Sequence, residues 1–281
     1  MRYNYIMKFY TNVVKFGNDI LYRGYENGKA VSNKIKYIPT LFEHNSNTSE
    51  NSKYKTLFGL TVDPIKNISD MRQAAKKIKQ YEEVANSNVY GMSNFVIQYL
   101  SDTFPDSVSY DRDLINVTTI DIEVQSDEGF PFPEDANHPV ISITCKNNID
   151  NVYYVWGLYG YDSDLNDKDI FYYQCEDEVD LLLKFTDWWQ YNTPDIVTGW
   201  NTKLFDIPYL VNRITKIMNE GISNKLSPWG IVREKTFRNK MGQDAAGYEI
   251  EGISQLDYYD LFQKFGVLTY GQQESFKLDH I

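Results

Sequence analysis

Two carboxylates within one strand-like segment are the residues of this sequence whose types and spacing best suit chemistry. Asp121 and Glu123 interrupt Ile115–Val124, which is otherwise apolar and β-branched. Residues two apart on a strand project from the same face, so the two carboxylates are expected to lie close together. Adjacent carboxylates on a core strand repel each other unless a cation lies between them. The pair therefore indicates a divalent-cation site, although an edge strand with two exposed acids has the same pattern.

A third carboxylate, Asp206, follows the next strand-like segment that ends in a glycine. Ile196–Trp200 is predicted to be a short strand, and Asp206 begins a helix predicted over Ile207–Met218, with Pro208 in its first turn. An aspartate in front of such a turn is commonly an N-cap. A carboxylate beyond the carboxyl end of a strand also points to the usual ligand site of an α/β sheet. Both interpretations stand at this point.

The composition restricts the kind of metal site that this chain can build. Its 281 residues include three histidines and two cysteines, too few for a disulfide framework or a zinc site rich in cysteine, and they make a histidine-built centre improbable. The apolar runs are far shorter than the ~18 residues of a membrane span. Any metal would therefore be held by carboxylates. A net charge of −11 argues, by itself, against a nucleic-acid binder.

The charge is unevenly distributed along the chain. Residues 1–110 carry 14 basic and 10 acidic side chains, whereas residues 111–281 carry 14 basic and 29 acidic ones. Such a change marks a domain boundary, with the polar stretch Ser101–Asp113 as its linker. We therefore expect one domain over 1–110 and a second over 111–281.

The periodicity of the chain predicts the α/β class for both regions. The first is expected to be a small mixed α/β unit, with a type I′ turn at Asn27-Gly28 and a helix capped by Ser69 that runs to about Ala85. Its strands are predicted at Met7–Phe16, Ile20–Tyr25, Ala30–Tyr37 and Phe95–Leu100.

The second region alternates strands and helices and is expected to form a mixed central sheet in an α/β layer architecture. Its central strand, Ile115–Val124, is expected to be covered on both faces. Further elements are predicted as strands at Val140–Cys145, Val152–Trp156 and Phe171–Cys175, a helix at Glu178–Gln190, and a hairpin between Ile231 and Ile253 around Asn239–Gly242.

Two motifs carry a resemblance to a known family. Thr119-Ile120-Asp121-Ile122-Glu123 and Gly199-Trp200-Asn201…Phe205-Asp206-Ile207-Pro208-Tyr209 resemble the first and second motifs of the 3′→5′ proofreading exonuclease of family B DNA polymerases, specifically those of large tailed bacteriophages. Residues 7–102 are similar to the amino-terminal domain that precedes the exonuclease. Other family-like segments follow in order: Gly129-Phe130-Pro131, His138-Pro139, Leu226-Ser227-Pro228 and Leu256-Asp257-Tyr258.

The resemblance implies a ribonuclease H-like fold for the second domain and a role for several residues. Asp121, Glu123 and Asp206 would be catalytic ligands of two divalent ions, Mg²⁺ or Mn²⁺. The substrate would be the single-stranded 3′ end of a DNA primer. Phe130 and Phe205 would stack on unpaired bases, although Phe130 is equally consistent with a core or turn aromatic. The remaining DNA-binding residues would be Asn201 and, in a hairpin that helps to separate primer from template or is merely solvated, Arg233, Lys235, Arg238 and Lys240.

The sequence also departs from the family. No aspartate after Asp206 has a tyrosine four residues before it, so the third exonuclease motif, Tyr-x-x-x-Asp, is absent, as are the polymerase motifs. We therefore expect an exonuclease domain truncated at its carboxyl end, with weak or no nuclease activity in the isolated chain. The alternatives are a catalytically silent scaffold, as one half of a split polymerase, and an unrelated ribonuclease H-like endonuclease.

The expected partners and location follow from the same resemblance. Besides DNA, the chain would bind the remaining polymerase segment or a second polymerase chain, and a sliding clamp through the missing part. It would be a viral protein in the cytoplasm of an infected bacterial host, without a membrane association.

Overall fold

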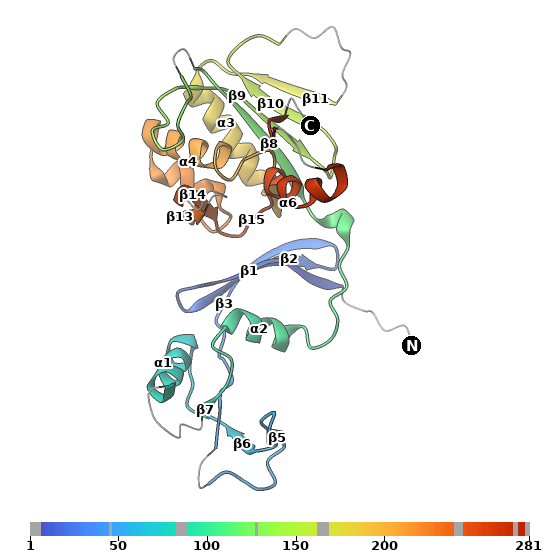
Figure 1. The fold of residues 1–281 in the computed structure, drawn as a ribbon, viewed down its shortest axis with the longest axis vertical. Coiled ribbons are helices and arrows are strands. Elements are labelled where there is room, and N and C mark those ends of the chain that lie inside the picture. Colours follow the sequence, from blue (N-terminus) through green and yellow to red (C-terminus); the bar gives the residue numbers. More distant parts are fainter. Residues whose placement is uncertain are drawn as a thin grey trace. The chain divides into compact units, whose positions relative to one another are not determined.

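The structure is a computed structural model that describes residues 7–44, 47–82, 89–126, 129–161, 169–238, 244–271 and 275–278. The chain forms two compact units, Met1–Tyr110 and Asp111–Ile281, each of which is considered by itself (Figure 1). The division falls where the charge balance of the sequence changes. Among the described residues, no helix is long and apolar enough to cross a membrane.

The first unit contains two antiparallel sheets. In the first sheet, β1 (Lys8–Phe16), β2 (Asp19–Glu26) and β3 (Lys29–Ile35) pair in sequence order. Asn27 and Gly28 have φ angles of 52° and 77°, as the predicted type I′ turn requires. The second sheet has the order β5-β6-β4-β7 and contains β4 (Phe42–Glu43), β5 (Tyr54–Lys55), β6 (Thr61–Pro64) and β7 (Val89–Tyr90).

Two details of the first unit correct the sequence-based expectation. Helix α1 spans Met71–Glu82, and its first turn is capped by Asp70 rather than Ser69, because the Asp70 carboxylate accepts from the Gln73 amide at 2.8 Å. The predicted end of this helix, near Ala85, lies outside the described residues. The predicted strand Phe95–Leu100 is wrong: these residues begin helix α2 (Phe95–Thr103), capped by Asn94. Phe95 and Tyr99, four residues apart, are its buried residues, which is helical spacing.

The second unit is built on a six-stranded mixed sheet, which confirms the predicted α/β class. The strand order is β11-β10-β9-β8-β12-β15, so β8 (Val117–Val124) lies inside the sheet. It pairs antiparallel with β9 and parallel with β12. The other strands are β9 (Val140–Asn147), β10 (Tyr153–Gly157), β11 (Ile170–Gln174), β12 (Ile196–Thr198) and β15 (Ser254–Gln255).

Helices α3 (Glu178–Tyr191) and α4 (Asp206–Ile217) lie together beside this sheet (Figure 1). Their apolar side chains form one core with Ile120, Ile122 and Trp156 of the strands. The hairpin of β13 (Val232–Arg238) and β14 (Asp244–Ile250) follows, and its predicted tip, Asn239–Gly242, lies outside the described residues. The remaining helices are α5 (Glu220–Ser223), α6 (Tyr258–Tyr270) and two 3₁₀ turns at Arg112–Leu114 and Asn224–Leu226.

The two faces of β8 differ sharply, which corrects the expectation that both are covered. Ile120 and Ile122 are buried in the core, whereas Thr119, Asp121 and Glu123 alternate with them and are exposed. A strand inside a sheet therefore presents its acidic face openly. The sheet positions the two carboxylates without enclosing them.

A carboxylate site on the central strand

Asp121 and Glu123 lie on the open face of β8 and influence each other electrostatically. Neighbouring atoms partly desolvate the Asp121 carboxyl group, and this raises its pKa. Desolvation also raises the pKa of Glu123, and the negative charge of Asp121 raises it further. The pair is therefore a region of negative potential that favours a proton or a cation.

Asp206, which follows β8 by more than 80 residues in the sequence, contacts the same strand. It is the first residue of α4 and is 3% exposed. Its Oδ1 atom accepts from the main-chain amide of Ile122 at 3.0 Å. Burial raises its pKa to about 8, and the charge of Asp121 contributes in the same direction. The N-cap interpretation is wrong, because Phe205 occupies the cap position and no side chain caps this helix.

Because β12 is short, one main-chain amide of β8 depends on the Asp206 carboxylate for its hydrogen bond. The ladder between the two strands ends where Thr198 pairs with Thr119. Beyond that point, the Ile122 amide has no strand partner on this side, and Asp206 supplies the acceptor. Asp206 is thus held at the position where pairing stops.

Two features fix the loop between β12 and α4: its close contact with the main chain of β8 at Gly199, and hydrogen bonds to the Asp257 carboxylate. A Cβ atom on Gly199 would lie 2.5 Å from the Ile120 carbonyl oxygen, so only glycine fits beside β8. Asn201 adopts a left-handed conformation with φ of 63°. The buried Asp257 carboxylate accepts from the amides of Asn201 and Lys203, each at 3.0 Å. The sequence indicated Asp257 only as part of a family-like segment, because its bracing role depends on contacts with residues more than 50 positions earlier in the chain.

Phe130 and Phe205 come together next to this loop. Their ring centroids are 5.5 Å apart, and Phe130 is 64% exposed, which excludes a core role for its ring. Phe205 is half-buried and packs on the core. Sequence reasoning missed Phe132, which is 60% exposed, with its centroid 5.6 Å from that of Phe130. Its position two residues after Phe130 was the available indication.

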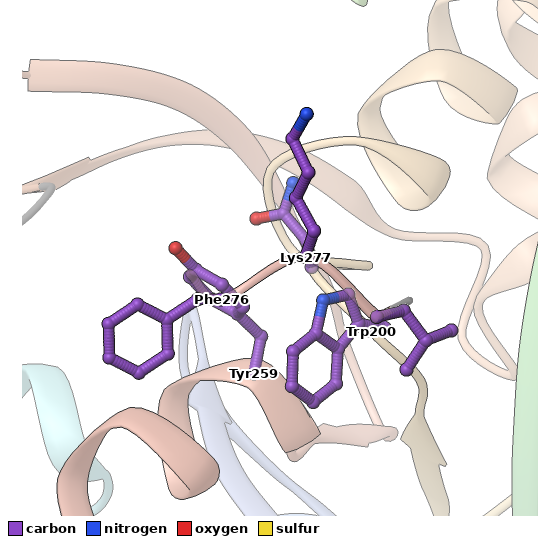
Figure 2. A pocket seen from close by; sticks show the side chains of 6 residues that line it. Trp200, Tyr259, Phe276 and Lys277 are labelled. Atoms are coloured by element: carbon purple, nitrogen blue, oxygen red, sulfur yellow. The ribbon is translucent and has the colours of Figure 1, made fainter. Parts of the chain in front are cut away.

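Trp200 lines two hollows, one of which also includes Asp121 in its lining. One, of about 400 Å³, is lined by Trp200, Asn201, Tyr259, Phe276, Lys277 and Leu278 (Figure 2). The other, of about 310 Å³, includes Asp121, Gly199, Trp200 and Tyr258 in its lining. The Trp200 ring also packs against Tyr259 and Phe262 of α6, with centroids 5.4 and 5.7 Å away. The predicted DNA-binding residue Asn201 thus faces a hollow with aromatic walls.

The predicted basic hairpin is partly neutralised by acidic side chains on β14 and directly after it. Lys235 Nζ lies 2.9 Å from Glu249, and Arg233 is paired with both Glu249 and Glu251. For Arg238 only the backbone is described, and Lys240 lies outside the described residues. A further cation, the Lys203 ammonium group, lies 4.3 Å from the ring centroid of Phe237. This contact joins the hairpin to the loop after β12.

Comparison with known families identifies the class of protein. The sequence signature described as "DNA polymerase family B, exonuclease domain" matches residues 76–281, nearly three quarters of the chain. The chain therefore belongs to the family B DNA polymerases and contains their exonuclease region.

Individual relatives agree with this assignment. The DNA-directed DNA polymerase of Escherichia phage RB69 is 36% identical over 299 aligned residues, which cover 98% of this chain and 32% of that polymerase. The corresponding polymerase of Enterobacteria phage T4 is 33% identical with the same coverage. The DNA polymerase catalytic subunit of Saimiriine herpesvirus 2 is 26% identical over 51% of this chain and 15% of the relative. The chain spans about a third of the length of the phage relatives.

Exonuclease domains of this family generally depend on divalent metals, so the fit of these side chains to such ions can be examined. Within the ranges that the structure describes, no three His, Cys, Asp or Glu side chains converge closely enough to hold a metal. The donor chemistry nevertheless fits, because hard cations prefer carboxylate oxygens. Asp121 raises the pKa of both Glu123 and Asp206, so a cation among the three carboxylates would relieve a repulsion that already exists.

Proposed function

We propose that this chain is the amino-terminal and exonuclease portion of a phage-type family B DNA-directed DNA polymerase. In this proposal, residues 1–110 are the amino-terminal domain, and residues 111–281 belong to the domain that removes misincorporated nucleotides from the 3′ end of DNA during replication. The observation that carries the proposal is the hydrogen bond from Ile122 to Asp206, which brings the second motif onto the strand of the first.

Asp121, Glu123 and Asp206 would hold the divalent ions, Mg²⁺ or Mn²⁺. When bound, two such ions activate the attacking water and stabilise the leaving 3′ oxygen. The chain's own contribution is to fix the acids: β8 sets the spacing of Asp121 and Glu123, and the Ile122 amide holds Asp206. The open face of β8 leaves room for a strand end.

The aromatic and polar neighbours would bind the DNA. Phe130 and Phe205 would stack on the unpaired terminal bases, because stacking tolerates any base. Asn201 would hydrogen-bond the strand end. Arg233, Lys235, Arg238 and Lys240 of the hairpin would contact phosphates where primer and template separate. For Arg233 and Lys235 this requires exchange of an existing carboxylate partner for a phosphate.

Metal binding and hydrolysis together test this function. Electron paramagnetic resonance of Mn²⁺ should show binding by the purified chain that is lost in Asp121→Asn and in Asp206→Asn. Asp187→Asn, a substitution on α3, is the matched control. Hydrolysis of a 5′-labelled single-stranded oligonucleotide should be slow, because the sequence lacks a Tyr-x-x-x-Asp motif. Unchanged Mn²⁺ binding in both site variants would contradict the proposal.

A catalytically silent scaffold within a split polymerase is the second candidate. It would bind nucleic acid and the other half of the polymerase without hydrolysing DNA itself. Co-purification of a second chain that carries the remaining motifs, with activity only in the mixture, would support it. Rapid Mg²⁺-dependent hydrolysis by this chain alone, abolished by Asp121→Ala, would exclude it.

We propose the cellular location and the partners of the chain from its similarity to the phage polymerases. The chain would act on DNA in the cytoplasm of an infected bacterium, together with the remaining polymerase segment or a second polymerase chain. A sliding clamp would be engaged through that other part. A pull-down with this chain as bait, from infected cells, would test these partners.

A further inference from the structure

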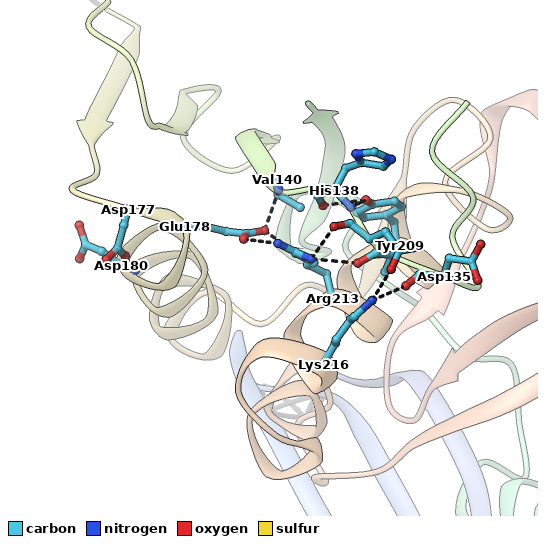
Figure 3. Close-up of polar contacts among 11 residues, drawn as sticks. Asp135, His138, Val140, Asp177, Glu178, Asp180, Tyr209, Arg213 and Lys216 are labelled. Carbon is cyan, nitrogen blue, oxygen red and sulfur yellow. Dashed lines mark hydrogen bonds and ion pairs between the residues drawn. The ribbon is translucent and has the colours of Figure 1, made fainter. Parts of the chain in front are cut away.

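Helix α4 carries a polar stripe that begins at the candidate metal ligand. Asp206, Tyr209, Arg213 and Lys216 follow one another at intervals of three or four residues, which places them along one side of the helix. Asn212 lies beside Arg213 on the same side. Apart from Asp206, these side chains contact the loop of residues 129–139, which lies between β8 and β9 and carries Phe130. Figure 3 shows the contacts of Tyr209, Arg213 and Lys216.

The stripe holds the loop through its main chain. Tyr209 Oη donates to the His138 carbonyl at 2.7 Å and accepts from the His138 amide at 3.1 Å. The other donors of the stripe each bind further carbonyl oxygens of the loop: Asn212 binds Pro133 at 2.9 Å, Arg213 binds Ala136 at 3.0 Å and Asn137 at 3.2 Å, and Lys216 binds Asp135 at 3.0 Å.

The loop is held in a conformation that it would not adopt freely. Ala136 has φ of 41°, in the left-handed region, which is unfavourable for a residue with a Cβ atom. Its side chain is fully buried, and its carbonyl is one of those that Arg213 binds. Arg213 is fixed in turn by Glu178, which also accepts from the Val140 amide where β9 begins. The loop is therefore anchored at its centre and at its end.

Phe130, an exposed residue of the loop, packs next to the start of α4. Phe130 lies 5.5 Å from Phe205, the residue that immediately precedes Asp206. The same helix thus fixes a carboxylate at its first residue and, through its polar stripe, the loop whose exposed Phe130 ring packs against Phe205, the residue before that carboxylate.

We infer that the polar stripe of α4 sets the position of Phe130 for stacking on the terminal base of single-stranded DNA, with Tyr209 and Arg213 as positioning residues. The inference rests on the proposed function. Tyr209 is fully buried and cannot touch DNA, so its contribution passes through the loop. Loss of its hydroxyl group should loosen the loop and weaken the binding of a strand end only as long as Phe130 is present.

A double-mutant cycle tests this coupling. The probe is a 12-nucleotide oligothymidylate with 2-aminopurine at its 3′ end and fluorescein at its 5′ end, in EDTA so that no hydrolysis occurs. Anisotropy gives the affinity, and 2-aminopurine emission reports how the terminal base is stacked. Phe130→Ala should weaken binding about 10-fold. Tyr209→Phe should weaken it roughly 3- to 10-fold in the unmodified chain, but less than about twofold in the Phe130→Ala background.

Two further variants keep the test decisive. Tyr154→Phe is the matched control, because it removes one tyrosine hydroxyl that bonds Asp150 elsewhere in the same unit, and it should leave binding unchanged. Lys216→Met loosens the exposed end of the stripe and repeats the cycle if Tyr209→Phe does not fold.

The possible outcomes distinguish a failure of this inference from a failure of the proposed function. Equal weakening in both backgrounds, or weakening by Phe130→Ala but by neither stripe variant, overturns the inference while the proposed function stands. Binding that is insensitive to Phe130→Ala overturns it as well. Failure of the unmodified chain to bind the probe overturns the proposed function and the inference with it.

Discussion

Arg213 and Glu178 form a bidentate ion pair that joins helices α4 and α3, with Nε–Oε1 and Nη2–Oε2 distances of 2.8 and 2.6 Å. Both side chains are nearly buried, at 11% and 13% exposure. The pair therefore connects the helix that carries Asp206 to the core helix beneath the sheet, and it does so at the point where the loop of Phe130 returns to β9.

Removal of one partner should cost more than removal of both. Arg213→Met leaves the Glu178 carboxylate nearly buried without its cation, and we expect a loss of about 3 kcal/mol in the free energy of unfolding. Adding Glu178→Gln should restore part of that loss. Urea denaturation of the two single variants and the double variant measures the coupling, and strictly additive losses would contradict it.

The stability of the metal-free chain should depend on pH through Asp206. Its pKa rises from an ordinary value of 3.8 to about 8 on folding. Its contribution is thus fully present below pH 3.8 and is lost as the pH rises through about 8, because between these values the folded chain holds the extra proton.

Thermal melting from pH 5 to 9 in EDTA measures this effect. Asp206→Asn keeps an acceptor for the Ile122 amide but cannot ionise, so its melting temperature should fall less over this range. Mn²⁺ at pH 8 should raise the melting temperature of the unmodified chain only. Parallel curves for the two proteins would show that Asp206 does not titrate as expected.

Gly199→Ala should destabilise the second unit by about 1–3 kcal/mol, because the added Cβ would lie 2.5 Å from a main-chain oxygen of β8 and the backbone would have to shift. Gly160→Ala is the matched control, since a Cβ there meets nothing within 4 Å. Chemical denaturation compares the two variants. Equal stability of both would argue against the close approach of this loop to β8.

Asp257→Asn should loosen the loop after β12 without unfolding the unit. The carboxylate gives one oxygen to the Asn201 amide and the other to the Lys203 amide, whereas a carboxamide has only one acceptor oxygen. Hydrogen exchange at one or both amides should accelerate roughly 10-fold, consistent with the loss of a charge-assisted bond. Unchanged exchange at both positions would exclude the bracing role.

Local patterns predicted much of this fold, and contacts distant in sequence account for what they missed. The β-branched run around Ile120 predicted β8, and the apolar spacing in Glu178–Gln190 predicted α3. The short apolar run Phe95–Leu100 was assigned to the wrong class, because such a run suits a strand or a buried helix turn. The open face of β8 depends on which elements pack there, and its own sequence does not encode that.

The candidate site shows the same limit. The spacing of Asp121 and Glu123 was sufficient to place them on one face. Asp206 resembled a cap because its partner, Ile122, lies 84 residues away. The contacts of Tyr209 and Arg213 with loop 129–139 are made with main-chain groups, which almost any residue provides, so no side-chain pattern marks them.

Because β12 ends early, the loop before α4 has to span a fixed distance. Seven residues separate Thr198, the last paired residue of β12, from Asp206, and they span the distance from the end of the ladder to the Ile122 amide. A residue inserted there would lengthen this connection, so the loop would have to rearrange for Asp206 to remain at the Ile122 amide. The length of this loop is therefore as much a part of the candidate site as Gly199 and the left-handed Asn201 within it.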